Sequence, residues 1–442
     1  MQFNGGGRSG TREAAAKARR GLRTAAVYGS QAAACHAARS GGPEWPSDMM
    51  RAMQTAFRNL RRAVVCMAAL LPPGAARPTP SAMAADPSST PSIAPREQPI
   101  RFKLVREWQA GDVTMPGNIV CLDDDEARSV AEGAEPEVAI VVLDGGRAAV
   151  ILDAAGRERA RHTLRIPGDR AVDYLRTAID SRHKRWWLAA ARGSPQVFLF
   201  DDEWTLRTSY PSLDGADDAP IGGATLADCD GDGSPEIIVG FAGTGGLEAA
   251  SLDGRRLWRA PSPAAVHDVT LDAPRPGGGR GLVCLDADGR LTPIDAEGIA
   301  GEARLVGPRR IRRLFGGPVA PDGAWAIVGL AADEAGEPEA VGIGPGLDPG
   351  WSLQLDRGPR HAAPVEAVAW ANLLGTQRRQ WLIAAADGSV TIAWADGGVV
   401  GRYRHGAPLV GIGGYRDRDG GHVVLATPDA VESLLIDDVA LD

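Results

Sequence analysis

The stretch from Ala224 to Gly240 reads ATLADCDGDGSPEIIVG and carries the most informative pattern in the chain. It begins as a short apolar segment, breaks into a loop of alternating carboxylates, and returns to the β-branched run Ile237 to Val239. Because a tight loop turns alternate side chains inward, its carboxylates can converge on one hard cation such as Ca²⁺, which takes about six to eight oxygen ligands. The carboxylates at loop positions one, three, five and nine are Asp228, Asp230, Asp232 and Glu236.

An EF-hand loop begins with the same alternation, so that alternative is tested first. Counting from Asp228, its twelfth position requires a bidentate Glu that opens a helix. The residue there is Val239, which lies inside the β-branched run. The pattern therefore predicts a strand, a loop and a second strand, and it excludes an EF-hand.

In this context the stretch resembles the calcium loop of FG-GAP/VCBS repeats, the units of β-propellers of the integrin α-chain N-terminal type. In that family the metal ligands stand at loop positions one, three, five, seven and nine, the seventh through its backbone carbonyl. The resemblance implies a calcium site formed by Asp228, Asp230, Asp232, Ser234 and Glu236. An acidic surface turn without a metal is the alternative that the pattern leaves open.

Strand patterns of the same kind recur from about residue 101 to the end of the chain. Each β-run is preceded by an apolar strand and followed by two more, with turns marked by Gly or Asp between them. Four short strands in a unit of about 45 residues are typical of a propeller blade. We therefore predict an all-β fold, a β-propeller of about seven four-stranded blades over residues 101–442. The runs begin near Val138, Trp187, Ile237, Leu282, Trp325, Trp381 and Val423.

The two ends of this repeat region predict how the ring closes. The last unit has strands near residues 409–413, 422–426 and 431–435, and a fourth strand is missing. The segment from Phe102 to Trp108 has no blade of its own and matches the outer strands of other units, with Trp108 in the place of Trp258. Pairing of this N-terminal strand with the last blade removes two open sheet edges.

Charge and composition divide the chain before the repeats. The formal net charge is -8, yet residues 1–62 contain eleven Lys/Arg and three Asp/Glu, so the remaining chain is strongly acidic. An acidic repeat region disfavours nucleic acid as a partner. Residues 1–48 are rich in Gly, Ala and Arg, and we interpret them as disordered or as the result of a start codon placed too early.

Residues 49–84 have the pattern of a secretory signal peptide. Four arginines between residues 51 and 62 precede the apolar run Ala63 to Leu71, and Ala82-Met83-Ala84 offers a cleavage site. The apolar run is too short for a membrane span, which needs about 20 residues. An Ala-rich disordered leader is the alternative. Residues 85–100 contain four prolines and are predicted to be a linker.

Motifs for catalysis are missing from the sequence. It contains no nucleophile elbow, Walker loop or HExxH motif, and its five cysteines form no CxxC pair. His267-Asp268, on a predicted innermost strand, and the basic run 309–313 are the two groups that invite comment, and both have a structural interpretation. The acidic groups Asp123–Asp125 and 417–420 resemble degenerate copies of the calcium loop. Packing between blades accounts for the recurrent tryptophans Trp108, Trp204, Trp258 and Trp351.

From these patterns we expect an exported, non-catalytic, calcium-binding β-propeller that acts as an interaction scaffold. Its expected partner is a protein or a cell-surface glycan, bound by loops at the ends of a rigid ring. We expect a monomer with no membrane span. The alternative function is a propeller enzyme, either a polysaccharide lyase or a quinoprotein-like dehydrogenase, because a fold does not settle function.

Overall fold

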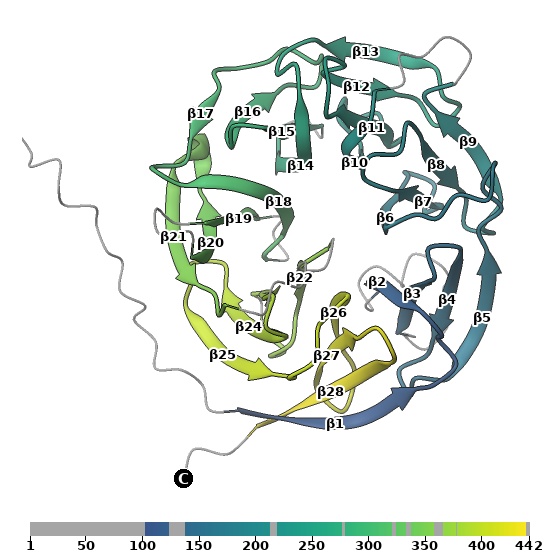
Figure 1. The fold of residues 1–442 in the computed structure, drawn as a ribbon, viewed down its shortest axis with the longest axis vertical. Helices are drawn as coiled ribbons and strands as arrows, with labels where there is room; N and C mark the ends of the chain where they lie inside the picture. Colours follow the sequence, from purple (N-terminus) through teal and green to yellow (C-terminus); the bar gives the residue numbers. More distant parts are fainter. Residues whose placement is uncertain are drawn as a thin grey trace, which may run out of the picture. The chain divides into compact units, whose positions relative to one another are not determined.

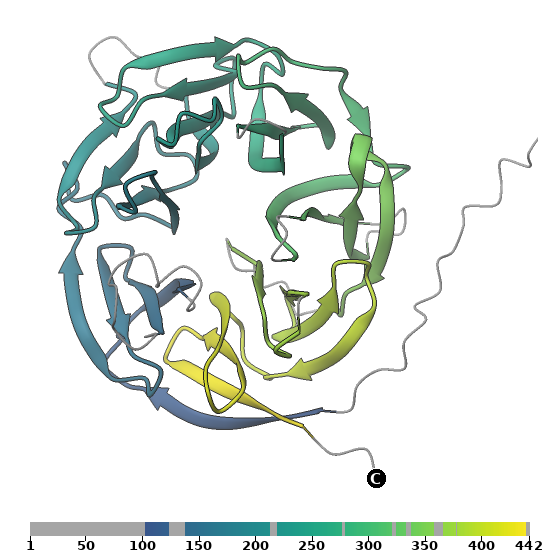
Figure 2. The same cartoon turned by 180° about the vertical axis from the view of Figure 1, so that it is seen from behind.

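A computed structural model describes the chain over residues 102–122, 138–212, 219–275, 279–320, 324–332, 337–357, 366–376 and 378–438. The predicted leader (1–48), signal peptide (49–84) and linker (85–100) lie outside these residues, as does Asp123–Asp125. The described residues form seven four-stranded antiparallel sheets arranged as a ring (Figure 1; Figure 2). Residues of all seven innermost strands line a cavity, and the space that they enclose is called the central channel below. Their one helical element is the short 3-10 helix η1 (Pro345–Leu347). The prediction of a seven-bladed, all-β propeller is confirmed.

Each blade runs from an innermost strand at the channel to an outermost strand at the rim (Figure 1). The innermost strands are β2 (Pro116–Leu122), β6 (Tyr174–Ile179), β10 (Ile221–Ala227), β14 (Val266–Pro274), β18 (Arg310–Pro318), β22 (Val368–Ala371) and β26 (Gly411–Arg416). The second strands are β3 (Ala139–Asp144), β7 (Arg185–Ala190), β11 (Glu236–Phe241), β15 (Arg280–Asp286), β19 (Trp325–Ala332), β23 (Gln380–Ala384) and β27 (Gly421–Ala426). These second strands are the seven β-runs that the sequence predicted.

The third and outermost strands complete each blade. The third strands are β4 (Ala148–Leu152), β8 (Val197–Phe200), β12 (Leu247–Ala250), β16 (Arg290–Ile294), β20 (Pro338–Ile343), β24 (Ser389–Trp394) and β28 (Val431–Asp438). The outermost strands are β5 (Glu158–Thr163), β9 (Leu206–Tyr210), β13 (Arg256–Ala260), β17 (Arg304–Leu305), β21 (Pro349–Gln354), β25 (Val399–Arg404) and β1 (Phe102–Ala110). Below, the end of the ring where the innermost strands begin is called the upper end, and the opposite end is called the lower end.

The last blade is closed by the first strand, as predicted. Strand β1 pairs antiparallel with β28, from Phe102 opposite Asp438 to Ala110 opposite Val431. Side chains reinforce this pairing, because Arg106 lies 2.8 Å from Glu432 and Glu107 lies 3.0 Å from the buried imidazole of His422 on β27. The innermost strand of this blade was predicted at residues 409–413, but it begins at Gly411 and extends to Arg416. Its last residues, Tyr415 and Arg416, pair with His422 and Gly421. The backbone pairing of β26 with β27 therefore extends beyond the apolar run.

The hydrophobic core lies between neighbouring blades. Leu188 and Leu199 of the second blade pack with Ile237 and Val239 of the third, and none of the four side chains is exposed. Strands β11 and β24 are buried over their full length because blades cover both of their faces. Burial of apolar surface at about 25 cal/mol per Å² therefore stabilises the ring as a whole, since a single blade has no second sheet to cover it.

A Trp–Gly contact recurs between neighbouring blades and explains the repeated tryptophans. The indole of Trp108 on β1 donates to the carbonyl of Ala154 at 2.7 Å and covers Gly156, where a Cβ would lie 2.4 Å from the ring. Gly156 has a φ of 74°, so its turn requires glycine for conformation as well as for space. Trp258 covers Gly298 and Trp351 covers Gly397 in the same way. The prediction that these three tryptophans pack between blades is confirmed.

Trp204 reverses this arrangement. It occupies the glycine position of the turn between β8 and β9, with a φ of 59°. Its ring stacks on Trp187 at a centroid distance of 4.7 Å and on His162 of the preceding blade at 5.7 Å. Trp204 also packs between blades, but it does so from the turn and not from the outer strand.

Candidate metal centre and the upper end of the channel

The acidic loop connects β10 to β11 at the lower end of the third blade. Gly231 and Gly233 have φ values of 81° and 84°, in the left-handed region that glycine tolerates best. The loop is held against the second blade, because the backbone amide of Ser181 donates to the carbonyl of Gly233 at 2.6 Å. The strand–loop–strand context that the sequence predicted is therefore present.

The structure brings three of the five predicted ligands together. Ligand oxygens of Asp228, Asp230 and Glu236 all lie within 4.8 Å of one another. Asp228 also accepts hydrogen bonds from the amides of Gly231 at 2.8 Å and Gly233 at 3.0 Å. The cluster joins the end of one strand, the middle of the loop and the start of the next strand.

Asp232 and Ser234 are placed differently from the predicted alternation. The carboxylate of Asp232 accepts from the backbone amide of Ser234 at 2.7 Å, and Asp232 is not part of the carboxylate cluster. Alternation of side chains holds for extended backbone, and Asp232 stands between two glycines with left-handed φ values. This local conformation explains why Asp232 does not join the cluster.

The surroundings of the cluster disfavour the negative charge of Glu236. Glu236 is 5% exposed, and its burial, reinforced by the negative charges of Asp230, Asp228 and Asp232, raises its pKa to about 7. The amide of Cys229 donates a hydrogen bond to Glu236 at 2.7 Å, which lowers the pKa of Glu236. Burial and the neighbouring negative charges outweigh this hydrogen bond. A proton or a cation would relieve this repulsion.

The second acidic loop, in the last blade, is a hydrogen-bonded turn. Asp417 accepts from the amides of Asp419 at 2.9 Å and Gly420 at 3.2 Å, and lies 2.9 Å from Nε2 of His422. Among the described residues, Asp228, Asp230 and Glu236 are the group of carboxylates close enough to share an ion.

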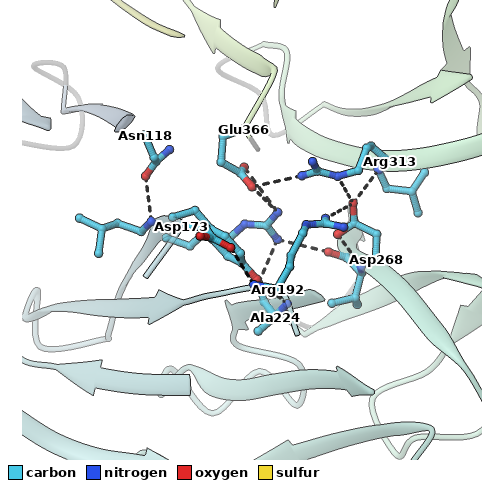
Figure 3. Close-up of polar contacts among 12 residues, drawn as sticks. Asn118, Asp173, Arg192, Ala224, Asp268, Arg313 and Glu366 are labelled. Carbon is cyan, nitrogen blue, oxygen red and sulfur yellow. Dashed lines mark hydrogen bonds and ion pairs between the residues drawn. The ribbon is translucent and has the colours of Figure 1, made fainter. Parts of the chain in front are cut away.

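A buried ion-pair network occupies the upper end of the channel (Figure 3). At its centre is Asp268 on β14, which is fully buried and accepts from Nε of Arg313 at 3.0 Å and from the amide of Leu314 at 3.0 Å. Arg192 lies 3.1 Å from the same carboxylate. Burial alone would raise the pKa of Asp268, but the charges of Arg313, Arg192 and Arg176 outweigh it and hold that pKa below its usual range.

The network also crosses the channel. Arg176 on β6 lies 3.2 Å from Glu366, which precedes β22 in the sixth blade, and donates to the carbonyl of Ala224 at 3.1 Å. Burial works against its charged guanidinium, but the negative charge of Glu366 outweighs burial and raises the pKa of Arg176. Arg313 reaches the same Glu366 at 3.6 Å. The second, fourth, fifth and sixth blades are thus joined by side chains that meet in the channel.

The sequence indicated part of this network. His267-Asp268 was interpreted as structural, and the contacts of Asp268 agree with that interpretation. Arg313 belongs to the basic run 309–313, whereas Arg176 and Glu366 carried no signal, because they are 190 residues apart and stand in no motif.

The basic run 309–313 is mostly engaged in ion pairs and hydrogen bonds. Arg309 pairs with Glu339 at 2.7 Å, Arg310 donates to the carbonyl of Ala287 at 2.5 Å, and Arg313 belongs to the network. These contacts stabilise the ring and leave Arg312 as the one exposed arginine of the run without a contact of this kind among the described residues.

Comparisons with known proteins support the fold. No protein family model matches the chain, and no curated protein matches it by sequence. Solved structures do match. One is the crystal structure of BBS1N in complex with ARL6DN, soaked with lead, with 12% identity, a TM-score of 0.55, and coverage of 78% of this chain and 99% of that chain. The same complex soaked with mercury has 12% identity, a TM-score of 0.54, and coverage of 77% and 99%.

Another match is the crystal structure of Chaetomium thermophilum Raptor, with 10% identity and a TM-score of 0.56 over 78% of this chain and 30% of that chain. Identities this low show the propeller fold alone. The FG-GAP/VCBS resemblance thus stays an interpretation of the acidic loop. Among the described residues, no helix is long and apolar enough to cross a membrane.

Proposed function

We propose that the protein is an exported, non-catalytic, calcium-binding β-propeller that serves as an interaction scaffold for a protein or a cell-surface glycan. The observation that carries the calcium part is the convergence of Asp228, Asp230 and Glu236 within 4.8 Å. Repulsion within this group, expressed in the raised pKa of Glu236, favours a bound cation. The residues present fit calcium, because all three donors are hard carboxylate oxygens.

Calcium suits this loop better than magnesium. Its coordination shell is larger and more flexible, whereas Mg²⁺ demands near-octahedral geometry and dehydrates reluctantly. An ion that binds the folded loop alone stabilises the fold by mass action, by about 2.7 kcal/mol at a hundred times its dissociation constant. Calcium bound here would join the end of β10 to the start of β11 and fix one loop at the lower end.

The scaffold part of the proposal is supported by the fold and by one neighbour. A closed ring of seven blades holds the loops at both ends on a rigid frame, and such loops are where recognition residues concentrate. The matching BBS1N structure is of a propeller crystallised with a protein, ARL6DN. The export part is supported by the basic, apolar and Ala-x-Ala pattern within residues 49–84.

Calorimetry on metal-stripped protein tests the calcium site. Added calcium should release or absorb heat with one site per chain, and should raise the melting temperature of the wild type. Asp230→Ala should abolish both effects, because it removes a central carboxylate of the cluster. Asp419→Ala is the matched control, since Asp419 is an exposed carboxylate in the corresponding loop of the last blade. Absence of heat and of stabilisation in the wild type would show that the loop is an acidic turn.

N-terminal sequencing of the protein recovered from the culture medium or cell envelope tests export. We expect the mature chain to begin near Ala85. Recovery of the intact segment 1–84 on protein confined to the cytoplasm would overturn this part of the proposal.

A further inference from the structure

The central channel contains a cavity of about 460 Å³. It is lined by the innermost strands and, at the lower end, by the first residues of several second strands. Small-molecule sites in proteins measure about 300–1,000 Å³ and are mostly apolar with a few well-placed polar groups. The size of the channel cavity is within that range.

Glycines allow neighbouring strands to pack closely around the cavity, and aromatic rings form part of its wall. Gly316, which lines the cavity, stands where a Cβ would lie 2.7 Å from the hydroxyl of Thr270 and 2.9 Å from the indole nitrogen of Trp325. A Cβ at Gly317 would lie 2.7 Å from the indole of Trp370. Trp325 and Trp370 both line the cavity and are partly exposed, so flat apolar surface faces the space.

The cavity is more positive than the chain. Its lining includes four arginines and two carboxylates, whereas the whole chain has a formal net charge of -8. At the upper end, Arg176 is paired with Glu366 at 3.2 Å. The other three arginines, Arg185, Arg280 and Arg379, stand at or beside the start of second strands β7, β15 and β23, toward the lower end.

Arg280 forms no ion pair among the described residues, although the negative charge of Asp228 is close enough to act on it. Its Nη1 atom is buried and has no hydrogen-bond partner within the described part of the chain. The guanidinium carbon lies 4.2 Å from the ring centre of Trp325, which holds the group against the cavity wall. A buried guanidinium nitrogen without an acceptor costs free energy that an anion bound in the cavity would recover.

We propose that the lower half of the central channel binds a small organic anion with a flat apolar body. The acidic group of the ligand pairs with Arg280, and its body packs against Trp325 and Trp370. Carboxylate and phosphate both suit the guanidinium, which forms bidentate hydrogen bonds to either. The proposed site does not require calcium, although Asp228 of the acidic loop also lines the cavity.

The test uses the full chain and two probes that differ in charge alone, 2-naphthoate and 2-naphthamide. Calorimetry and quenching of tryptophan fluorescence should show one site per chain for 2-naphthoate, with a dissociation constant below about 1 mM. Naphthamide should bind at least about tenfold more weakly, because it has the same body without the charge-assisted hydrogen bond.

Substitutions localise the site. Arg280→Gln should weaken 2-naphthoate about tenfold or more, because it removes the cationic group, and should leave the melting temperature unchanged or higher, because it removes a buried nitrogen without a hydrogen-bond partner. Arg290→Gln is the matched control, an exposed arginine of the same blade outside the cavity lining. It should bind 2-naphthoate like the wild type.

Three results would overturn the proposal: no saturable binding of 2-naphthoate to the wild type, equal affinity for both probes, or equal weakening by both substitutions. The comparison of the two probes needs the wild type alone, so it decides the matter even where a variant does not fold. Measurement with calcium and with chelator separates this site from the acidic loop. Naphthoate binding in chelator supports the channel site, whether or not the acidic loop binds calcium.

Discussion

The upper and lower ends of the channel use charge in opposite ways. At the upper end Arg176, Arg192 and Arg313 surround the carboxylates of Asp268 and Glu366, and these contacts join four blades. At the lower end the carboxylates of the acidic loop repel one another, and Arg280 forms no ion pair within the described part of the chain. Single nitrogens of Arg192 and Arg313 also lack a hydrogen-bond partner, but each of those guanidinium groups lies within 3.1 Å of Asp268. Charges that satisfy one another stabilise a fold, whereas charges left unsatisfied indicate where a ligand binds. We infer that the upper end is structural and that the lower end is the binding end.

The strongest test of this comparison is Asp268→Asn. The substitution removes the buried negative charge that Arg313 and Arg192 contact at 3.0 and 3.1 Å, and leaves both guanidinium groups without that counter-charge. We expect a loss of about 3–5 kcal/mol in the free energy of unfolding, the range for breaking a buried ion pair from one side. Urea unfolding measures it. Asp230→Asn at the lower end, in chelator, is the control and should lose no stability; equal losses would remove the distinction between the ends.

Acid titration should show a smaller effect of the same origin. The pKa of Asp268 is lower in the folded protein than its ordinary value of 3.8, because of Arg313, Arg192 and Arg176. Its contribution to stability is therefore complete above the unfolded pKa and is lost as the pH falls through the folded pKa. Urea unfolding from pH 6 down to about pH 2 should show the difference between wild type and Asp268→Asn shrinking at the acid end. A difference that stays constant with pH would show that packing, and not charge, explains the substitution.

The smallest expected effect comes from Glu236→Gln at the lower end. Glutamine keeps an oxygen to accept the Cys229 amide but removes a charge that burial disfavours. In chelator at pH 8 we expect the free energy of unfolding to rise by about 0.5–2 kcal/mol, the range for a single stabilising substitution. In calcium the order should reverse, because the wild type alone gains the ion. Thermal unfolding in the two buffers checks both signs, and a variant less stable than wild type in chelator would contradict the comparison.

The fold could be predicted because its signals are local. Strand length, turn residues and a spacing of about 45 residues identify a blade from contiguous sequence, and the missing last strand identifies the closure. The acidic loop was located for the same reason, since its residues fall within nine positions. What local pattern could not supply is the backbone conformation at Gly231 and Gly233, which turns Asp232 away from the cluster.

The contacts of the network across the channel could not be predicted, because their residues belong to distant blades that meet when the ring forms. Arg176 and Glu366 stand in different blades, and each is an ordinary charged residue in its own stretch of sequence. Likewise, Arg280 is unremarked in sequence until the structure places it over Trp325 with a buried nitrogen. A single sequence gives no information about which charges meet across a channel.

The pairing of β1 with β28 has a consequence for how the ring assembles during synthesis. The first strand of the ring to leave the ribosome finds its partner only after some 320 further residues have been made, since Ala110 pairs with Val431 (431 minus 110 is 321). Until then β1 has no neighbour to accept its backbone hydrogen bonds, and six blades can complete their own sheets while the seventh waits. Bringing such distant segments together is slow, because the loop-closure entropy is lost before the contacts form. Interrupted synthesis would therefore yield an open arc with an unpaired edge strand, a species prone to join with other copies of itself.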